Sequence, residues 1–511
     1  MKKRNENIRT PYYMSKQEIV IVWFKRDLRF TDHEPLFYAQ KTNLPILLIY
    51  CFEPSLMRYH DSDVRHWRFV YQSLQDMQSK LIEQQTQIVI FHQEALYVFK
   101  ELQKKYSIKS LFSHQEIGNH ISFQRDLAIK EFCTHHQIKW KEYQHNGVIR
   151  KLKSRKDWEK RWKEKMEEAP KIIDEDHGHF LTIDQSWYKN LKGKELPSSI
   201  TQAHKSFQRG GETLAWKYLD SFLKGRYTTY SKHISKPALS RRSCSRISPY
   251  LSYGNISMRM VYQYTMQHYK TASNKRALTN FISRLHWHCH FMQKFEDECR
   301  MEFEPVNKAF NTLSKQKNDA YILAWQTGKT GVPIVDACMR CVTETGYLNF
   351  RMRAMVVSFF VFNLWQDWRE LRYLAKQFLD YEPGIHYPQL QMQSGITGIN
   401  TIRIYNPIKN SMELDEDAGF IKTWIPELSL VPSKLIHEPW KMSNLEQEMY
   451  QVIIGKDYPY PIVDIEESRK NASEIMWSFR KNKAVKDEGI RILQKHVNNK
   501  NKKDLFNNNT P

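Results

Sequence analysis

The sequence is poor in cysteine and has no long apolar run. Seven of its 511 residues are cysteine, and their odd number and irregular spacing fit a reducing compartment better than a disulfide framework. No apolar run reaches the roughly 18–20 residues that cross a bilayer. The N-terminal stretch MKKRNENIRTPYYMSKQ is basic but lacks the apolar core of a secretory signal. We therefore expect a cytoplasmic protein without a membrane partner.

Acidic residues are scarce relative to basic ones. The chain has 78 Lys and Arg against 56 Asp and Glu, which gives a net charge of +22 and a pI of about 9.4. Such an excess attracts polyanions, because neutralised phosphates release their counterions. A Lys-rich surface can instead serve solubility alone. A charge this large favours nucleic acid as the partner, and with it a nucleoid-associated location, but it does not distinguish DNA from RNA.

The N-terminal third also lacks a GxGxxG motif, so a standard dinucleotide fingerprint is absent. Short β-branched runs begin at Glu18 (EIVIVWF), at 44–52 (LPILLIYCF) and at 87–92 (QIVIFH). They alternate with amphipathic stretches at 64–84 and 123–135. This alternation predicts a doubly wound, parallel, Rossmann-like α/β domain over residues 18–147. A ligand could lie at the carboxyl ends of its strands.

The rest of the chain reads as a connector, a helical domain and a tail. Residues 150–168 are dense in mixed charge, with Trp158 and Trp162 four apart, and predict a solvated helix that opens a connector over 148–205. Helical periodicity then dominates, which predicts a larger all-α domain over 206–475. From residue 476 to 511 the chain is basic and poor in apolar residues, so we expect a flexible tail.

Two clusters raise the question of a metal site. The stretch RLHWHCHF at 284–291 puts His286 and His290 four apart on one helical face, and Cys338 and Cys341 form a thiol pair three apart. A single C-x2-C inside an apolar helix, without a second matching pair, is a weak zinc signal. Buried structural cysteines are the favoured interpretation, and we expect no bound metal.

A third cluster is rich in hydroxyls and arginines. In SRRSCSRISPYLSYGNIS, at 240–257, Ser245 and Ser248 could cap a helix and offer backbone N–H groups to an anion, with Arg246 adding charge. Taken by itself, the segment favours an ordinary helix cap over an anion site.

The most irregular stretch is FLDYEPGIHYPQLQMQSG, which follows an apolar helical segment. Its Asp380 and Glu382 are candidate partners for the arginines of NFRMRAM at 349–355. Arg351 and Arg353 are two apart and therefore lie on different faces of a helix. One could pair with an internal carboxylate while the other reaches a phosphate.

Seven motifs in order resemble the photolyase/cryptochrome flavoproteins, over about residues 19 to 470: VWFKRDLRFTDHEPL, SCSRISPYLSYGNIS, AWQTGKTGVPIVDACMR, RMRAMVVSFF, DWRELRYLAKQFLD, RIYNP and YPYPIVD. The resemblance implies an antenna-type α/β domain followed by a helical domain that holds FAD. In the repair members, blue light drives an electron from reduced flavin to a pyrimidine dimer flipped out of DNA. It therefore implies a DNA photolyase of a divergent bacterial type, with the cyclobutane dimer as substrate. The alternatives are a cryptochrome-like photoreceptor without repair activity and a plain nucleic-acid-binding protein with a vestigial flavin cavity.

The resemblance also assigns residues. The FAD contacts it implies are Tyr230, Cys244, Ser245, Arg246, Ile247, Ser248, Phe281, Arg353, Asp380, Tyr381, Glu382 and His386. His386 would lie opposite flavin N5, where it also counts as a catalytic residue together with Trp287, Arg284, Met392 and Trp368. Trp287 would line the lesion pocket, and Trp368 would stand in the electron-transfer chain. His288, Phe350 and Arg351 would contact DNA.

Several positions depart from the family pattern. Arg284 replaces a Glu that hydrogen-bonds the dimer, and Phe350 replaces a polar residue at the pocket mouth. Leu390 and Met392 replace tryptophans, so photoreduction of the flavin would need another route. Neither Phe350 nor Ala354 supplies the histidine pair of the (6-4) enzymes.

The resemblance implies UV-damaged DNA as the partner of a monomer and admits a second, antenna chromophore. Folate, a deazaflavin, another flavin and none all remain open, because SHQEIGNHISFQRD matches the folate-binding pattern poorly. No cysteine follows Cys341, which disfavours the iron–sulfur branch.

Overall fold

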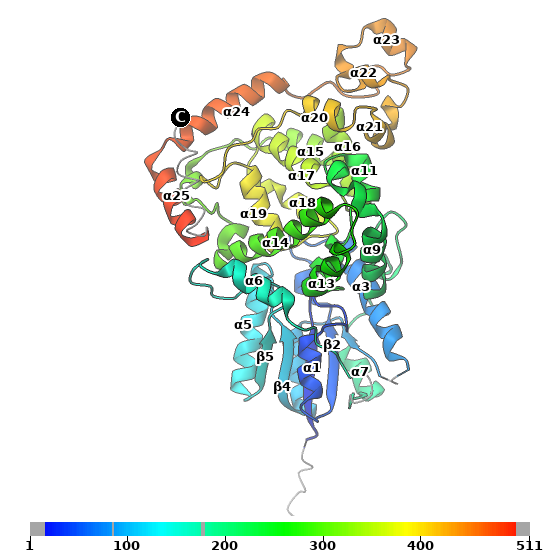
Figure 1. Ribbon diagram of the computed structural model, residues 1–511, viewed down its shortest axis with the longest axis vertical. Coiled ribbons are helices and arrows are strands. Elements are labelled where there is room, and N and C mark those ends of the chain that lie inside the picture. The colour runs from blue at the N-terminus through cyan, green and yellow to red at the C-terminus, as the bar shows by residue number, and fades with distance from the viewer. Residues whose placement is uncertain (1–15, 84–85, 175–178, 497–511) are drawn as a thin grey trace, which may run out of the picture.

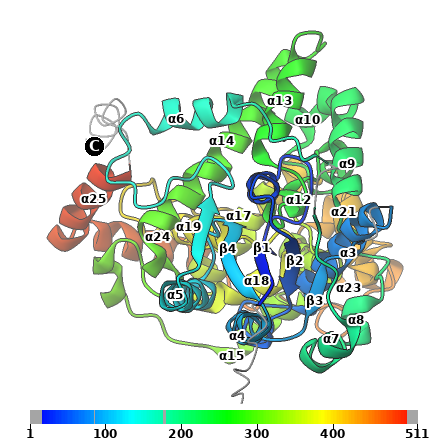
Figure 2. The same ribbon diagram turned by 90° about the horizontal axis from the view of Figure 1, so that it is seen from below.

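A computed structural model describes residues 16–83, 86–174 and 179–496 (Figure 1). The N-terminal part is an all-parallel, five-stranded sheet in the order β3-β2-β1-β4-β5. Figure 2 shows β4, β1, β2 and β3 side by side. The strands are β1 (Glu18–Phe24), β2 (Ile46–Cys51), β3 (Val89–Phe91), β4 (Ser107–His114) and β5 (Lys139–Tyr143). The parallel sheet predicted from the alternating sequence pattern is confirmed.

Strand β1 supplies two hydrophobic cores, because successive side chains of a strand point to opposite faces. Val20 and Val22 pack with the helices of one face, and Ile19 and Ile21 with those of the other. The helices concerned are α1 (Glu34–Gln40), α3 (Val64–Leu81), α4 (Ala95–Lys105) and α5 (His120–His135). The sheet is therefore covered on both faces, as a doubly wound domain requires.

The connector packs more closely than its charge suggests. It contains α6 (Trp158–Glu167), α7 (Gln185–Leu191) and α8 (Ser198–Thr201). Trp158 and Trp162 are 3% and 5% exposed, and the Trp162 ring meets Tyr262 of α13 (Met258–Tyr269) edge-on at 5.6 Å. Two indoles four residues apart share one helical face, and burying that face outweighs the surrounding charge. The expectation of a solvated helix is therefore wrong for this face.

The remainder is helical, as the periodicity predicts. Its helices are α9 (Glu212–Lys224), α10 (Tyr230–His233), α11 (Pro237–Ser243), α12 (Ser248–Ser252), α13, α14 (Lys275–Asp297), α15 (Asp319–Thr327), α16 (Pro333–Thr345), α17 (Phe350–Ser358), α18 (Arg372–Gln377), α19 (Pro383–Gln393), α20 (Pro407–Leu414), α21 (Gly419–Trp424), α22 (Ser433–Ile436), α23 (Asn444–Met449), α24 (Ile465–Arg480) and α25 (Lys483–His496). Among the described residues, none of the helices has both the length and the apolar character to span a membrane.

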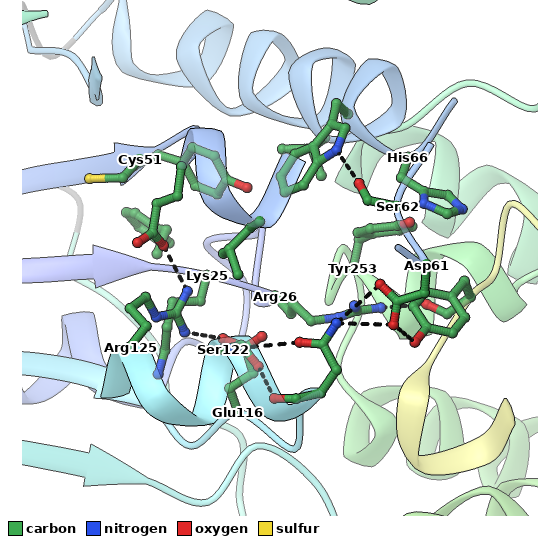
Figure 3. A pocket seen from close by; sticks show the side chains of 18 of the residues that line it. Lys25, Arg26, Cys51, Asp61, Ser62, His66, Glu116, Ser122, Arg125 and Tyr253 are labelled. Atoms are coloured by element: carbon green, nitrogen blue, oxygen red, sulfur yellow. Dashed lines mark hydrogen bonds and ion pairs between the residues drawn. The ribbon is translucent and has the colours of Figure 1, made fainter. Parts of the chain in front are cut away.

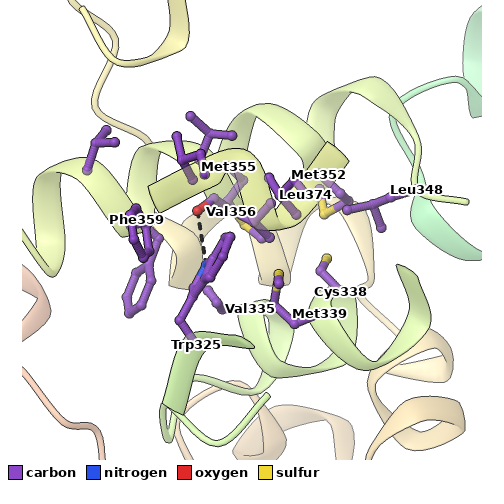
Figure 4. Close-up of a cluster of buried hydrophobic side chains, with 14 of the residues drawn as sticks. Trp325, Val335, Cys338, Met339, Leu348, Met352, Met355, Val356, Phe359 and Leu374 are labelled. Atoms are coloured by element: carbon purple, nitrogen blue, oxygen red, sulfur yellow. Dashed lines mark hydrogen bonds between the residues drawn. The ribbon is translucent and has the colours of Figure 1, made fainter. Parts of the chain in front are cut away.

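The core of the helical domain forms where α15, α16 and α17 meet (Figure 4). Trp325 is fully buried there, and its indole N–H donates to the Val356 carbonyl at 3.2 Å. Cys338 and Cys341 lie buried in α16 as free thiols. This placement agrees with the structural interpretation of the two cysteines.

The expected flexible tail is partly wrong. Residues 476–496 belong to α24, the turn after it, and α25, whereas 497–511 lie outside the described residues. Buried Glu298 accepts hydrogen bonds from Arg491 at 2.6 Å and lies 3.0 Å from His496 Nε2, and Val485 and Ile492 of α25 are buried. Low mean apolar content hid this helix, because its few apolar residues recur at helical spacing on one face.

Two motifs far apart in the sequence pack on each other and join the domains. We call residues 26–32, after β1, and 252–259, around the start of α13, the clasp. The Leu28 N–H donates to the Tyr253 carbonyl at 3.1 Å, and the Arg29 guanidinium donates to the Gly254 carbonyl at 3.0 Å. A Cβ at Gly254 would lie 2.2 Å from the Arg26 carbonyl oxygen, so glycine permits this close approach.

A buried ion pair completes the clasp. Arg259 donates to the carboxylate of Asp32 at 2.5 and 3.0 Å, and the Ser257 hydroxyl adds a third bond at 2.6 Å. Burial alone would raise the pKa of Asp32, but the hydrogen bonds from Arg259 and its charge hold it below the ordinary value. Such a pair stabilises the fold only while both partners are present.

We expect Arg259→Ala to lower the free energy of unfolding by about 3–5 kcal/mol, because it removes the guanidinium that pairs with the buried carboxylate of Asp32. Lys409→Ala is the control, since Lys409 and Glu413 form an exposed pair at 3.8 Å and should contribute no more than about 1 kcal/mol. Chemical denaturation followed by circular dichroism measures both. Equal effects of the two substitutions would mean that the clasp does not depend on this ion pair.

Candidate functional site

A cavity of about 110 Å³ lies between α17, α19 and the segment 378–382. We call it the helical cavity. One part of its wall is apolar: Phe350, Ala354, Val357, Phe378, Ile385 and Leu390. The other part is polar: Arg353, Asp380, Tyr381, Glu382, His386, Gln389 and Gln393. Six of the residues assigned from the resemblance therefore meet around one space: Phe350, Arg353, Asp380, Tyr381, Glu382 and His386.

The expected pairing of Arg353 with Asp380 is present. One guanidinium nitrogen of Arg353 lies 3.0 and 2.9 Å from the two carboxylate oxygens, and the guanidinium sits 4.0 Å from the centre of the Phe378 ring. Burial would raise the pKa of Asp380, but the charge of Arg353 and its hydrogen bonds keep it below the ordinary value. The cavity wall therefore carries a fixed, ionised carboxylate beside a cation.

Two buried polar atoms in the wall have no hydrogen-bond partner among the described residues. They are His386 Nε2 and Gln389 Oε1. Burial, with the charge of Arg353, lowers the pKa of His386 to about 3, so its imidazole is neutral at pH 7. An unsatisfied buried polar group costs about 1–3 kcal/mol. A planar ring with donors and acceptors along its edge would satisfy both atoms, and the isoalloxazine of FAD is such a ring.

The segment 244–248 is held by its backbone. Arg226 donates hydrogen bonds to the carbonyl oxygens of Cys244 and Ser245. Arg246 adopts a left-handed φ of 60°, and its guanidinium lies 3.6 Å from the Tyr347 ring centre. Its Nε is buried and has no hydrogen-bond partner in the described part of the chain, although another of its nitrogens donates to Gln208 at 3.1 Å.

Neither serine of this segment caps α12. The helix begins at Ser248 with Ile247 at the N-cap position, and no side chain accepts from its first turn. The Ser248 hydroxyl instead helps to lower the pKa of Asp380, so it lies near that buried carboxylate. The expected cap is therefore wrong. The nearby carboxylate places this segment beside the helical cavity.

Tyr230 and Phe281 pack against each other rather than line the helical cavity. Their rings meet edge-on at 6.1 Å, and both are buried in the core that includes Ile247. Arg284, whose side chain is exposed on α14, lies near the Tyr230 hydroxyl at the edge of this core.

Aromatic rings and a cation are exposed on the helical domain. Trp287 is 46% exposed and stacks on Phe291 at 5.6 Å, and Phe350 is 48% exposed while it also lines the helical cavity. Arg351 is exposed beside Tyr405, whose hydroxyl lies 3.3 Å away. An exposed ring offers a face on which an extruded base can stack.

Three assigned residues lie elsewhere. His288 is half-buried and lines a cavity between the domains together with Arg26 and Glu382, and burial lowers its pKa to about 4. This internal position differs from the expected DNA contact. Successive side chains of a helix point about a quarter of a turn apart, so His288 lies off the face that exposes Trp287. Trp368 is 5% exposed in the 3-10 turn η5 (Trp368–Leu371), and Met392 is half-buried in α19.

Sequence reasoning assigned no role to Arg26. Its guanidinium donates to the Ser252 carbonyl at 2.9 Å and to the Tyr381 carbonyl at 2.6 Å, and lies 3.4 Å from Glu382. Burial raises the pKa of Glu382 to about 7, against the opposing charge of Arg26. The sequence feature that could have identified Arg26 is a cation shortly after a buried strand, at the sheet edge where α/β domains bind ligands.

A second cavity, of about 90 Å³, opens at that edge (Figure 3). We call it the sheet-edge cavity. Arg125 bridges two of its carboxylates, at 2.8 Å from Glu53 and 2.6 Å from Glu116, while Asp61 lies on the side of the helical domain. Tyr381 lines both this cavity and the helical one. The cavity is lined by the ends of β1 and β2 and by Glu116, which follows β4, and the strand order changes direction between β1 and β4.

The histidines considered for metal binding have other contacts. His286 and His290 lie against the Trp158 ring, at 5.1 and 6.0 Å between ring centres. The structure brings Asp27 together with His33 and His114 instead. His33 Nδ1 accepts from the Leu36 N–H at 3.2 Å, so its Nε2 carries the proton that is donated to Asp27 at 2.9 Å. This group is a buried hydrogen-bond network.

We expect Asp380→Ala to weaken FAD binding by roughly tenfold to a hundredfold, because Arg353 then loses its charged hydrogen-bond partner, a contribution of about 1.5–3 kcal/mol. Titration of the FAD-free protein with FAD, followed by fluorescence, measures the affinity. Asp367→Ala is the control, since Asp367 pairs with Arg369 on the surface at 3.1 Å. Unchanged FAD affinity in Asp380→Ala would remove this pair from the cofactor site.

Comparison with known proteins places these features in one family. The family model "DNA photolyase" matches residues 20–168, and "FAD binding domain of DNA photolyase" matches 281–478. The chain is 26% identical over 478 residues to the deoxyribodipyrimidine photo-lyase of Alkalihalophilus pseudofirmus, and 28% over 484 residues to the cryptochrome DASH of Synechocystis sp.. Each alignment covers 88% of this chain and 96% of the relative.

Solved structures show the same fold. The cryptochrome of Synechocystis sp. PCC6803 superposes with a TM-score of 0.80 at 23% identity. The photolyase of Sulfolobus tokodaii, solved with two FAD molecules, gives 0.74 at 25% identity. Each covers 90% of this chain and 99% of the other. The family models, the nearly full-length relatives and the shared two-domain fold lead to one conclusion: the chain belongs to the photolyase/cryptochrome family.

Proposed function

We propose that the protein is a blue-light-driven DNA photolyase that binds FAD in the helical cavity and splits a cyclobutane pyrimidine dimer flipped out of UV-damaged DNA. The observation that carries the proposal is the helical cavity itself. Its wall holds the Arg353–Asp380 pair and His386 Nε2, which has no hydrogen-bond partner in the described part of the chain, and exposed Phe350 forms part of its edge. A cofactor bound there would lie close to the surface that receives DNA.

The protein's own side chains hold and isolate the cofactor. Bound FAD supplies a light-absorbing group that gives an electron to the lesion and takes it back. Arg353 and Asp380 would hold the polar edge of its ring, and neutral His386 would offer the ring a hydrogen-bonding atom. Ala354 and Leu390 cover the apolar part of the wall and exclude water.

Damaged DNA fits the charge and the exposed rings. A net charge of +22 favours phosphate contacts, and exposed Arg351 is placed to make one beside the cavity edge. Trp287 and Phe350 offer exposed aromatic faces to an extruded base. Extrusion costs only a few kcal/mol for a lesion that stacks and pairs poorly.

A cryptochrome-like photoreceptor without repair activity is the second candidate, and Arg284 favours it. The family resemblance leads one to expect a carboxylate there, which accepts hydrogen bonds from the dimer, whereas a guanidinium only donates. Relatives named cryptochrome DASH stand beside those named photo-lyase. Repair remains the first proposal, because the exposed Trp287 and Arg351 and the charge of the chain all suit DNA.

The sheet-edge cavity suits the second, antenna chromophore. Trp67 and Tyr253 present rings to it, and the cations Lys25, Arg26 and Arg125 line it. The Sulfolobus tokodaii photolyase was solved with two FAD molecules. A flat heterocycle, such as a folate, a deazaflavin or a flavin, would stack on these rings and accept hydrogen bonds from the cations.

The test is light-driven repair by protein with reduced FAD bound. Oligonucleotides with a single cyclobutane dimer or (6-4) product, single- and double-stranded, are illuminated with blue light, and recovered thymine is measured by chromatography. We expect cyclobutane dimers to be restored in the light and not in the dark. With FAD bound and reduced, failure to restore either lesion would overturn repair in favour of the photoreceptor.

Two tryptophans of equal exposure provide a matched control for this test. Trp287 is 46% exposed on α14 and Trp477 is 45% exposed on α24. Loss of one stacked base costs about 1–3 kcal/mol. Trp287→Ala should therefore weaken binding of dimer-containing DNA by about tenfold or more, whereas Trp477→Ala should not.

A further inference from the structure

Tyr381 forms a wall between the two cavities. Its side chain is 5% exposed and lines both the helical cavity and the sheet-edge cavity. Its phenol donates a hydrogen bond to Oδ2 of Asp61, which belongs to the turn after α2 (Pro54–Met57). Figure 3 shows Asp61 at the end of the sheet-edge cavity that faces the helical domain.

Within the described residues, every hydrogen bond of Asp61 is one that its carboxylate accepts. The Asn119 amide nitrogen lies 3.1 and 3.0 Å from the two oxygens, and the Tyr387 hydroxyl lies 3.4 Å from Oδ2. Asp61 is 2% exposed. An ionised carboxylate is the form that accepts from all of these donors at once. Asp61 is therefore placed to take a proton from Tyr381.

The helical cavity also needs a new electron donor. Leu390 lines it where the family resemblance leads one to expect a tryptophan, and a saturated side chain cannot give up an electron at accessible potentials. Tyr381 is an oxidisable ring in the same wall. His386, the residue expected opposite flavin N5, meets the Tyr381 and Tyr387 rings edge-on at 5.3 Å each.

We propose that Tyr381 and Asp61 form a proton-coupled electron donor that photoreduces the bound flavin in place of a tryptophan at position 390. The inference rests on the proposed binding of FAD in the helical cavity. One electron passes from the Tyr381 phenol to the light-excited oxidised flavin. The phenolic proton moves to Asp61 Oδ2 as the O–H bond breaks. The products are a neutral tyrosyl radical, a protonated Asp61 and a flavin reduced by one electron.

Coupling the proton transfer to the electron transfer avoids the cost of a buried positive charge. Removing an electron from a buried phenol that kept its proton would leave a positive charge on the ring at low dielectric, which is costly. Transfer of the proton to Asp61 avoids this charge. An external thiol then gives a hydrogen atom to the tyrosyl radical and becomes a thiyl radical. Asp61 releases its proton to solvent, so the donor is ready again.

The test is the rate of flavin photoreduction in blue light with a thiol present, followed as bleaching of the oxidised flavin band. Tyr381→Phe keeps the ring and removes the hydroxyl, and Asp61→Asn keeps the shape and removes the proton acceptor. Tyr458→Phe is the matched control, since Tyr458 is a fully buried tyrosine that donates to a buried Asp336 at 2.5 Å and lines neither cavity described above.

We expect Tyr381→Phe and Asp61→Asn to slow photoreduction by about tenfold or more, and Tyr458→Phe to leave the rate within about twofold. A merely structural role would not produce two further signatures in the wild type: slower photoreduction in deuterium oxide, and a transient tyrosyl signal in electron paramagnetic resonance that Tyr381→Phe lacks. The flavin content of every variant is measured beside the rate.

The results that would contradict electron transfer from Tyr381 differ from those that would contradict the proposed function. If flavin-loaded Tyr381→Phe photoreduces at the wild-type rate, or if the loaded wild type shows neither the isotope effect nor the radical, the route is overturned while FAD binding stands. If the wild type binds no flavin even after reconstitution, the proposed function fails and the route fails with it.

Discussion

The guanidinium of Arg26 is the contact on which the arrangement of both domains depends. It projects from the end of β1 and reaches the carbonyls of Ser252 and Tyr381 and the carboxylate of Glu382. Segment 380–382 forms the polar wall of the helical cavity. The α/β domain therefore positions that wall directly. The Asp32–Arg259 pair and the Gly254 approach join the same segment after β1 to residues 252–259.

This clasp explains why the cavities lie where they do. A parallel sheet gathers the ends of its strands at one edge, and the residues after β1 meet the helical domain there. Tyr381 is held by its carbonyl to Arg26 and by its hydroxyl to Asp61, so both ends of one residue are bonded to the α/β domain. The wall between the two cavities is thus a shared element rather than a surface of either domain.

Patterns in the sequence predicted the elements better than the contacts between them. Alternating runs predicted β1 and β2, and helical periodicity predicted the second domain, because burial imposes a repeat on the sequence. The motif resemblance predicted the Arg353–Asp380 pair, which the structure contains. Arg26 was missed because a single cation after a strand is not part of any periodic sequence pattern. Helix α25 was missed because mean composition conceals a narrow apolar face.

The site predictions failed for side chains whose orientation depends on a buried carboxylate that is distant in the sequence. Ser248 turns to Asp380 instead of capping α12, and His288 turns inward beside Glu382. Both depend on carboxylates that are distant in sequence and buried only in the folded chain. In contrast, the exposure of Trp287 and Phe350 agrees with surface roles that local sequence can suggest.

The central claim is that both domains together build a site for one FAD. The most direct measurement is the flavin content of the purified full-length protein, by absorbance before and after denaturation and by chromatography of the released cofactor. The account predicts one FAD per chain in the helical cavity, released when the fold is lost, with any second chromophore counted separately. A folded protein that contains no FAD and takes up none from excess FAD would contradict it.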